Sequence, residues 1–157
     1  MIVDASVLLS AFFPDEAQAQ AQAVLRQHAS GRERLKAPTL IVYEVTNAVW
    51  QAERRGRISS AQADEILQAT AGLDMELLPL RWGEGLPLAR RFARSAYDAA
   101  YLALAEGQGE SLITADERLY NTVHPKLQWV LWLGDYTEQV DGHFLTQRRQ
   151  IPKAQRK

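Results

Sequence analysis

Cysteine is missing from the 157-residue sequence, and histidine occurs three times, as His28, His124 and His143. A chain without thiols forms no disulfide bond, no thiolate zinc site and no cysteine nucleophile. The three histidines lack the spacing of metal ligands, which favours surface positions for them over a zinc site. A metal site in this chain would therefore depend on oxygen ligands.

Long hydrophobic runs are missing as well. The apolar stretch from Val7 to Phe13 ends at Pro14 and is far shorter than a membrane span. The opening residues contain no basic segment, and Asp4 interrupts their apolar run, which is unlike a signal peptide. We therefore expect neither an export signal nor a membrane segment, and we expect a cytoplasmic location.

Neither sign of charge is in large excess, because 18 basic residues face 19 acidic ones and the net charge is −1. The distribution is nevertheless uneven. Five basic residues and no acid occur in residues 143–157, which leaves 13 basic and 19 acidic side chains in residues 1–142. The balanced total combines an acidic body with a basic tail, so it does not exclude a nucleic-acid partner.

The length and a hydrophobic content of 46% indicate one domain with a core that needs no disulfides. Short apolar runs predict strands at residues 1–3, 35–37, 75–80, 111–114 and 127–133. Helices are expected over residues 6–13, from Pro14-Asp15 to about His28, and over residues 39–55, 61–71, 86–94, 96–106 and 116–123. This alternation predicts an α/β fold with helices on both faces of a parallel sheet.

Four carboxylates stand at unusual places in this pattern. Asp4 directly follows the first expected strand, and Asp116 lies two residues beyond the fourth. In an open parallel sheet, ligands bind beyond the carboxyl ends of the strands. Glu44 borders the apolar face of the third expected helix, and Asp98 is the only charged residue in residues 96–105.

Carboxylates that converge in one pocket repel one another, at about 4 kcal/mol for one pair about 4 Å apart at an effective dielectric of about 20. A basic partner, shared protons or a bound cation relieves this repulsion, and oxygen-only ligands suit Mg²⁺ or Mn²⁺. Beside a phosphodiester, such a site predicts metal-assisted hydrolysis. Each acid also has a structural explanation. Asp4 and Asp116 suit helix N-caps, Asp98 suits a capping box with Ser95, and Glu44 suits the solvent rim of its helix.

Around these acids the sequence resembles PIN-domain ribonucleases, most closely the VapC-type toxins of bacterial and archaeal toxin–antitoxin pairs. Residues 2–8 (IVDASVL) are similar to the first motif of that family, and residues 43–50 (YEVTNAVW) to the second. The third and most specific motif corresponds to residues 97–106 (YDAAYLALAE), and the fourth to residues 112–119 (LITADERL). The order and the spacing of the motifs fit the family over roughly residues 1–133.

The resemblance implies a three-layer α/β/α sandwich with a central, mostly parallel sheet. It places a PIN-like nuclease domain in residues 1–133 and leaves residues 134–157 as a C-terminal extension with the basic tail. It implies a metal-dependent endoribonuclease whose Mg²⁺ or Mn²⁺ is held by Asp4, Glu44, Asp98 and Asp116. Asp4 and Asp98 are expected as the main ligands. Glu44 and Asp116 are expected to bind the metal or its waters, and one of them to orient the attacking water.

Three polar side chains lie close to these acids in the sequence, namely Ser6, Asn47 and Thr114. A hydroxyl or amide in such a place can bond a ligand carboxylate or a metal-bound water, although local capping and turn bonding explain these residues equally well. Arginines in residues 54–57 and 90–94 suit RNA phosphates around the pocket or a solvated helix face. Arg118 stands where some relatives carry another acid.

Family members cut single-stranded regions or loops of RNA and leave 5′-phosphate and 3′-hydroxyl ends, and the resemblance also implies a homodimer silenced by an antitoxin. Two other functions stay open from the residues alone. One is a PIN-domain RNA-processing nuclease without an antitoxin, and the other is a non-catalytic module whose acidic pocket docks a basic peptide. A P-loop enzyme is excluded because its Gly-rich Lys-Ser/Thr motif is absent. A haloacid-dehalogenase-type site would need an acid where Ser6 stands.

Overall fold

The computed structural model describes residues 1–137, so the basic tail expected in residues 143–157 lies outside the described residues. Five short strands form one sheet: β1 (Ile2–Val3), β2 (Lys36–Pro38), β3 (Glu76–Leu78), β4 (Leu112–Thr114) and β5 (Val130–Trp132). The strand order is β3-β2-β1-β4-β5, and each neighbouring pair is parallel. The expected parallel sheet is confirmed.

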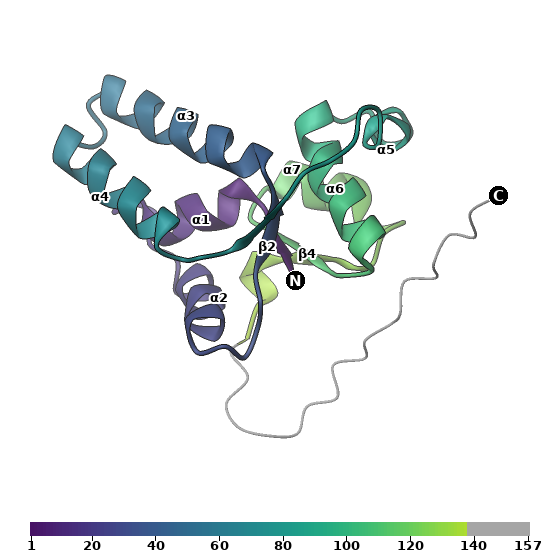
Figure 1. Ribbon diagram of the computed structural model, residues 1–157, viewed down its shortest axis with the longest axis horizontal. Coiled ribbons are helices and arrows are strands. Elements are labelled where there is room, and N and C mark those ends of the chain that lie inside the picture. The colour runs from purple at the N-terminus through teal and green to yellow at the C-terminus, as the bar shows by residue number, and fades with distance from the viewer. Residues whose placement is uncertain (138–157) are drawn as a thin grey trace.

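The helices of the described chain form two layers around this sheet. They are α1 (Ala5–Phe12), α2 (Ala19–Ala29), α3 (Leu40–Arg54), α4 (Ser60–Ala71), α5 (Leu86–Phe92), α6 (Ala96–Gln108) and α7 (Glu117–Val123), followed by the short 3₁₀ helix η1 (Leu133–Asp135). Figure 1 shows α1 to α4 on one side of the strands and α5 to α7 on the other. The expected three-layer α/β/α sandwich is confirmed.

The chain reverses its direction across the sheet at β1. From β1 it proceeds outward to β2 and β3, and it then returns to place β4 on the opposite side of β1. Val3 is in register with Ile113, so the residues that follow β1 and β4 lie at the same edge of the sheet. Such a switch point leaves a crevice beyond the carboxyl ends of the two strands, where open α/β sheets bind ligands.

The α6 helix is buried along most of its length, because it lies between the sheet and α5. Its residues 99–105 are all buried, and Leu102 and Ala105 are fully inaccessible. Four alanines in this run keep the helix narrow enough to approach the strands closely. Asp98 lies in the first turn, where the positive end of the helix dipole favours a carboxylate.

Two helix boundaries differ from the expectation. Pro14-Asp15 does not begin a helix: the amides of Glu16 and Ala17 both bond the carbonyl of Phe13 in a turn, and α2 starts at Ala19. The α6 helix continues through Gly107 and ends at Gly109, whose φ of 68° only glycine adopts readily. None of the helices in residues 1–137 is both long enough and apolar enough to cross a membrane.

Candidate active site

Asp4 lies directly after β1, where its side chain caps the N-terminus of α1. Its Oδ1 accepts a bond from the Ser6 hydroxyl at 2.5 Å and one from the Val7 amide at 3.3 Å, and its Oδ2 accepts a bond from the Thr114 hydroxyl at 2.5 Å. The residue is only 5% exposed. The helix-cap explanation of Asp4 is therefore correct. The two hydroxyls expected near it do bond its carboxylate.

Burial raises the pKa of the Asp4 carboxyl to about 6, against an ordinary value of 3.8. The hydrogen bonds from Ser6 and Thr114 oppose this change, while the neighbouring charge of Asp116 adds to it. The partners of the Asp4 carboxylate are neutral donors, which orient it without neutralising its charge. A carboxylate in that situation gains from a nearby cation.

Asp116 follows β4 and caps α7, because its Oδ1 accepts a bond from the Leu119 amide at 2.9 Å. The hydroxyls that bond Asp4 also hold this segment: the Asp116 amide donates to Thr114 Oγ1 at 2.9 Å, and the Ala115 amide donates to Ser6 Oγ at 2.8 Å. The ends of β1 and β4 are thus joined by two side-chain hydroxyls. This arrangement fixes the positions of two carboxylates relative to each other.

Asp98 shows half of the capping box that the sequence suggested. Its amide donates to the Ser95 hydroxyl at 3.0 Å. Its carboxylate instead accepts a bond from Arg94, with 2.9 Å between Nε and Oδ2. The Arg94 guanidinium also reaches Asp116, with 3.8 Å between a terminal nitrogen and Oδ2. Arg94 therefore joins the acid of α6 to the acid that follows β4.

Glu44 projects from the first half of α3 and is half-buried, where the Tyr101 hydroxyl of α6 donates to its Oε2. Burial raises the pKa of the Glu44 carboxyl, the Tyr101 bond opposes this, and the charge of Asp98 adds to it. The pKa of Tyr101 lies above its ordinary value because the ring is buried, because its hydroxyl bonds Glu44 and because Asp4 is near. Glu44 is therefore not a residue of the solvent rim.

The four acids converge from four different elements. Asp4 is coupled electrostatically to Asp116, and Glu44 to Asp98, while Arg94 connects the two pairs. Three of the carboxylates also lie at helix N-termini, whose dipoles offset part of the repulsion. The fold thus brings all four predicted acids to one edge of the sheet.

The donor set suits a hard divalent cation, because the side chains that converge here offer oxygen atoms. Among residues 1–137, no three of the acids and histidines already surround one point closely enough to hold an ion. Asp98 is turned toward Arg94. His28 and His124 are half-buried and bond backbone carbonyls, so they are structural residues and not the surface residues that we expected.

Two residues of this cluster were not recognised in their present roles. For Arg94 the sequence left RNA phosphates and a solvated helix face as alternatives, yet the side chain pairs with Asp98 and Asp116. Tyr101 has no predicted role from the sequence, although its spacing of three residues from Asp98 places both on one face of a helix. Asn47 is exposed on α3, and within the described residues no side-chain hydrogen bond joins it to the four acids.

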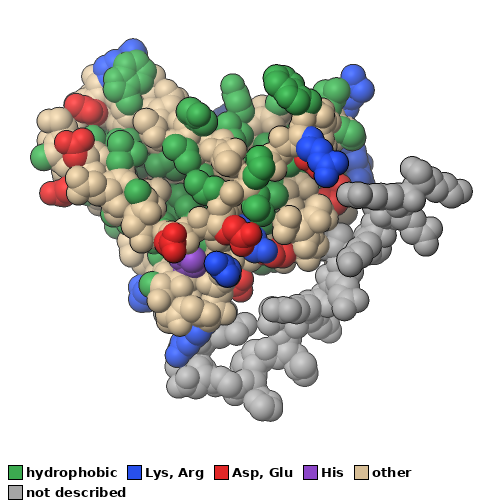
Figure 2. Space-filling model, viewed as in Figure 1, with side chains coloured by type: hydrophobic (Ala, Val, Ile, Leu, Met, Phe, Trp, Pro, Cys, Tyr) green, Lys and Arg blue, Asp and Glu red, His purple; other side chains and the backbone are tan. Residues whose placement is uncertain are grey.

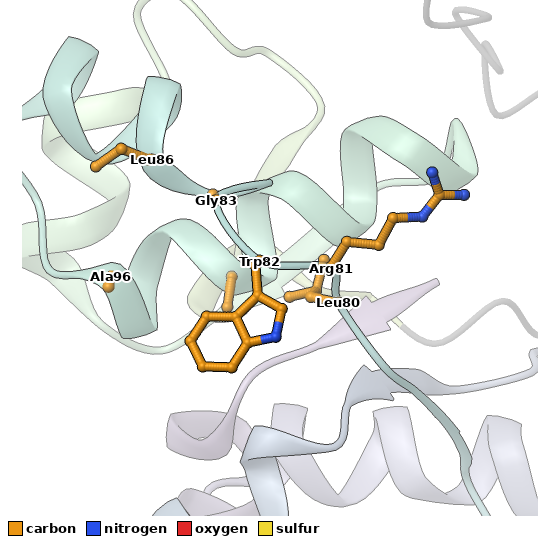
Figure 3. A pocket seen from close by; sticks show the side chains of 8 residues that line it. Leu80, Arg81, Trp82, Gly83, Leu86 and Ala96 are labelled. Atoms are coloured by element: carbon orange, nitrogen blue, oxygen red, sulfur yellow. The ribbon is translucent and has the colours of Figure 1, made fainter.

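Two hollows lie near the acids. A groove of about 460 Å³ is lined by Ser6 and Ala115, which neighbour the acids, and by Arg55 and Arg57. Arg57 is already paired with Asp15. A second hollow of about 420 Å³ is largely apolar, and Figure 3 shows residues of the segment before α5 and of the start of α6 around it.

Large hydrophobic side chains are exposed beside this second hollow and on α3. They are Val42, Tyr43 and Trp50 of α3, Trp82 and Leu86 around the start of α5, and Tyr97 of α6. Figure 2 shows hydrophobic side chains spread over one face of the molecule, from the α3–α4 side to the α5–α6 side. Exposed apolar surface of this extent is typical of a protein-binding face.

Comparison with known proteins relates the chain to one family. The family model of the PIN domain matches residues 1–124. Ribonuclease VapC3 of Pyrobaculum aerophilum is 32% identical over 123 residues, which covers 76% of this chain and 91% of that protein. Ribonuclease VapC9 of Mycobacterium tuberculosis is 33% identical over 122 residues, which covers 78% of this chain and 90% of that protein.

A solved structure has the same fold. The crystal structure of PAE2754 from Pyrobaculum aerophilum aligns with a TM-score of 0.64 and 27% identity, and the alignment covers 85% of this chain and 83% of that one. The family model, the two VapC relatives and the solved structure thus each match most of this chain. The chain belongs to the PIN-domain family, as a VapC-type member.

Proposed function

We propose that this protein is a divalent-metal-dependent endoribonuclease that acts as the toxin of a toxin–antitoxin pair. The observation that carries the proposal is the convergence of four carboxylates beyond β1 and β4, with the buried Asp4 held by neutral donors, namely the hydroxyls of Ser6 and Thr114 and the amide of Val7. The two VapC relatives bear the name ribonuclease, which supports RNA as the substrate. The nuclease domain is proposed to span residues 1–133.

Asp4 and Asp98 are proposed as the main ligands of Mg²⁺ or Mn²⁺, and Glu44 and Asp116 as ligands of the ion or of its waters. Bound there, the ion would lower the pKa of a water molecule and stabilise charge on the phosphate oxygens. Ser6 and Thr114 hold the Asp4 carboxylate in one orientation. Such supporting bonds keep a ligand in place before the ion arrives.

The residues of the chain then have distinct tasks in hydrolysis. Tyr101 bonds Oε2 of Glu44, so we assign Oε1 to hold the attacking water and accept its proton. The raised pKa of Glu44 suits a general base. The water oxygen bonds to phosphorus while the bond from phosphorus to the 3′ oxygen breaks. The products are a 5′-phosphate and, once that oxygen takes up a proton, a 3′-hydroxyl.

The groove lined by Ser6, Ala115 and Arg55 is the proposed path of the RNA. It adjoins the acids, and Arg55 supplies positive charge for the phosphates beside the cleaved bond. A single strand or an unpaired loop suits this groove, because an unpaired nucleotide can bring its phosphate to the carboxylates without melting a duplex.

The exposed hydrophobic side chains of α3, α5 and α6 support a homodimer, and the acidic pocket supports an antitoxin with a basic segment. Trp82 is fully exposed, a costly position for an indole that has no partner. Sedimentation velocity tests the dimer: Trp82→Asp should shift the protein to a monomer, whereas a wild-type monomer at micromolar concentration would contradict it.

The activity is tested with Asp98→Asn, which keeps the size of the side chain and removes its charge. Cleavage of a single-stranded RNA with Mn²⁺ should fall at least about 100-fold, because losing a ligand costs more than losing a supporting bond. Asp64→Asn on the exposed side of α4 is the matched control and should keep full activity. Undiminished cleavage by Asp98→Asn, or full wild-type activity in EDTA, would refute the assignment.

A further test separates the toxin from an RNA-processing nuclease. Expression of the wild-type chain should arrest growth, and Asp98→Asn should not. The arrest should be relieved by the product of a neighbouring gene. Growth that is unaffected by an active enzyme would favour the RNA-processing function.

A further inference from the structure

Arg94 is placed by an unusual turn between α5 and α6. Ala93 ends α5 in the left-handed conformation, with φ of 50°, which is uncommon for a residue other than glycine. The amides of Ala93 and Arg94 both bond the carbonyl of Ala89, the latter at 3.1 Å. This turn sets Arg94 two residues before α6 and four residues before Asp98, so its side chain is directed along the first turn of that helix.

The Arg94 guanidinium contacts Oδ2 of two acids, through a hydrogen bond to Asp98 and a longer ion pair to Asp116. Its Nε lies 2.9 Å from Oδ2 of Asp98, and a terminal nitrogen lies 3.8 Å from Oδ2 of Asp116. The Arg94 side chain is 21% exposed and that of Asp98 is 24% exposed, so the pair is more shielded than an ordinary surface ion pair. The contact therefore neutralises part of the acidic pocket from within the chain.

We propose that Arg94 is a built-in counter-cation, which holds Asp98 and Asp116 in the metal-free protein and competes with the divalent ion for them. The inference rests on the proposed metal dependence. It explains why, among residues 1–137, the acids do not already surround one point, since Asp98 is turned toward the guanidinium. It also explains how a chain with four converging carboxylates folds before metal binds, because a positive charge already lies among them.

Competition follows from the shared carboxylates. A guanidinium and a divalent cation repel each other, and the proposed ion would be held by Asp98 and Asp116, the two acids that Arg94 contacts. Metal binding must therefore break the two Arg94 contacts. The free energy of those contacts lowers the affinity of the pocket for metal. Below a threshold concentration of free metal, Arg94 therefore remains paired with the two acids.

The test measures Mn²⁺ binding by titration calorimetry for the full chain, Arg94→Gln and the control Arg90→Gln. Arg90 is exposed on the neighbouring α5, and its replacement changes the net charge equally. Arg94→Gln should bind Mn²⁺ about fivefold more tightly, the factor that corresponds to one partly shielded ion pair, while Arg90→Gln should match the wild type. A purely structural role for Arg94 would weaken metal binding instead.

Unchanged or weaker binding by Arg94→Gln, beside a wild type that binds Mn²⁺, would overturn the counter-cation and leave the proposed function standing. A wild type that binds no Mn²⁺ would overturn both. Thermal unfolding gives a second readout without activity. Arg94→Gln should unfold at a lower temperature than the wild type in EDTA. Saturating Mn²⁺ should raise the unfolding temperature of Arg94→Gln by more than it raises that of the wild type. Equal gains in the two proteins would count against the proposal.

Discussion

Replacing Asp4 by Asn should stabilise the metal-free protein at neutral pH, although it should abolish activity. The Asp4 carboxyl is buried, and its pKa is raised from 3.8 to about 6, first by that burial. Each pKa unit corresponds to about 1.4 kcal/mol, so holding the charged form in the folded protein costs up to about 3 kcal/mol. An uncharged Asn avoids this cost. Its side-chain amide, however, faces the hydroxyl of Thr114, which donates a hydrogen bond to Asp4, and the loss of that bond reduces the gain in stability by about 1 kcal/mol or more.

The sign of the pH dependence follows from the direction of the shift. Because the folded protein has the higher pKa, it binds the Asp4 proton more tightly than the unfolded chain does. The stabilisation from protonated Asp4 is fully present below about pH 3.8 and is lost as pH rises through about 6. Asp4→Asn should therefore be more stable than the wild type by up to about 2 kcal/mol near pH 7.5, and its stability relative to the wild type should fall by about 2 kcal/mol near pH 4.5, so that the advantage disappears there.

Urea unfolding in EDTA, followed by tryptophan fluorescence at both pH values, measures these differences. Asp64→Asn on the exposed side of α4 is the control and should follow the wild type at each pH. Addition of Mn²⁺ should make the wild type the more stable of the two, because the ion stabilises a protein that binds it and Asp4→Asn has lost a proposed ligand. The reasoning is wrong if Asp4→Asn is less stable than the wild type near pH 7.5, or if the difference is the same at both pH values.

The remaining predictions concern the supporting contacts. Tyr101→Phe removes the donor to Glu44 and should cost about 1 kcal/mol of unfolding free energy near pH 7.5, because Glu44 is only half-buried. The loss should shrink in acid, where Glu44 is protonated, and Tyr97→Phe, on the exposed side of α6, should cost less than about 0.5 kcal/mol. Burial alone would raise the pKa of Glu110, but the 2.6 Å bond from Lys36, the bond from the N-terminal amine of Met1 and the charges of both groups together lower it. Glu110→Gln should therefore cost about 1 kcal/mol near pH 7, and this cost should vanish as pH falls through the lowered pKa. Urea unfolding at several pH values checks both changes, and losses that are independent of pH would contradict them.

Much of the fold follows from local patterns. All five strands and the seven α-helices of residues 1–137 were expected near their observed positions, because short apolar runs and helical periodicity are properties of neighbouring residues; the 3₁₀ helix η1 was not expected. The misplaced start of α2 has a local cause as well. Pro14 and the residues after it form a turn closed by the Phe13 carbonyl, and proline-acid pairs are common in turns as well as at helix starts.

The four acids were singled out because each carboxylate stood beside or within an apolar element. Their pairing could not be deduced in the same way. The Ser95 cap on the Asp98 amide was expected, but the partner of the Asp98 carboxylate depends on the turn at Ala93. A left-handed alanine has no signature in the sequence, so the direction of the Arg94 side chain was not predictable.

The sequence by itself determined the chemistry that this protein can use. Without cysteine, and with carboxylates at the ends of strands and on apolar helices, it predicted an oxygen-ligand site on an α/β fold. Only the tertiary structure decided which groups meet: Thr114 bonds Asp4 across 110 residues of chain, Tyr101 bonds Glu44 across 57, and Arg94 connects two acids. The physical reason is that composition and periodicity are local, whereas the reversal of the chain at β1 brings distant residues to one edge of the sheet.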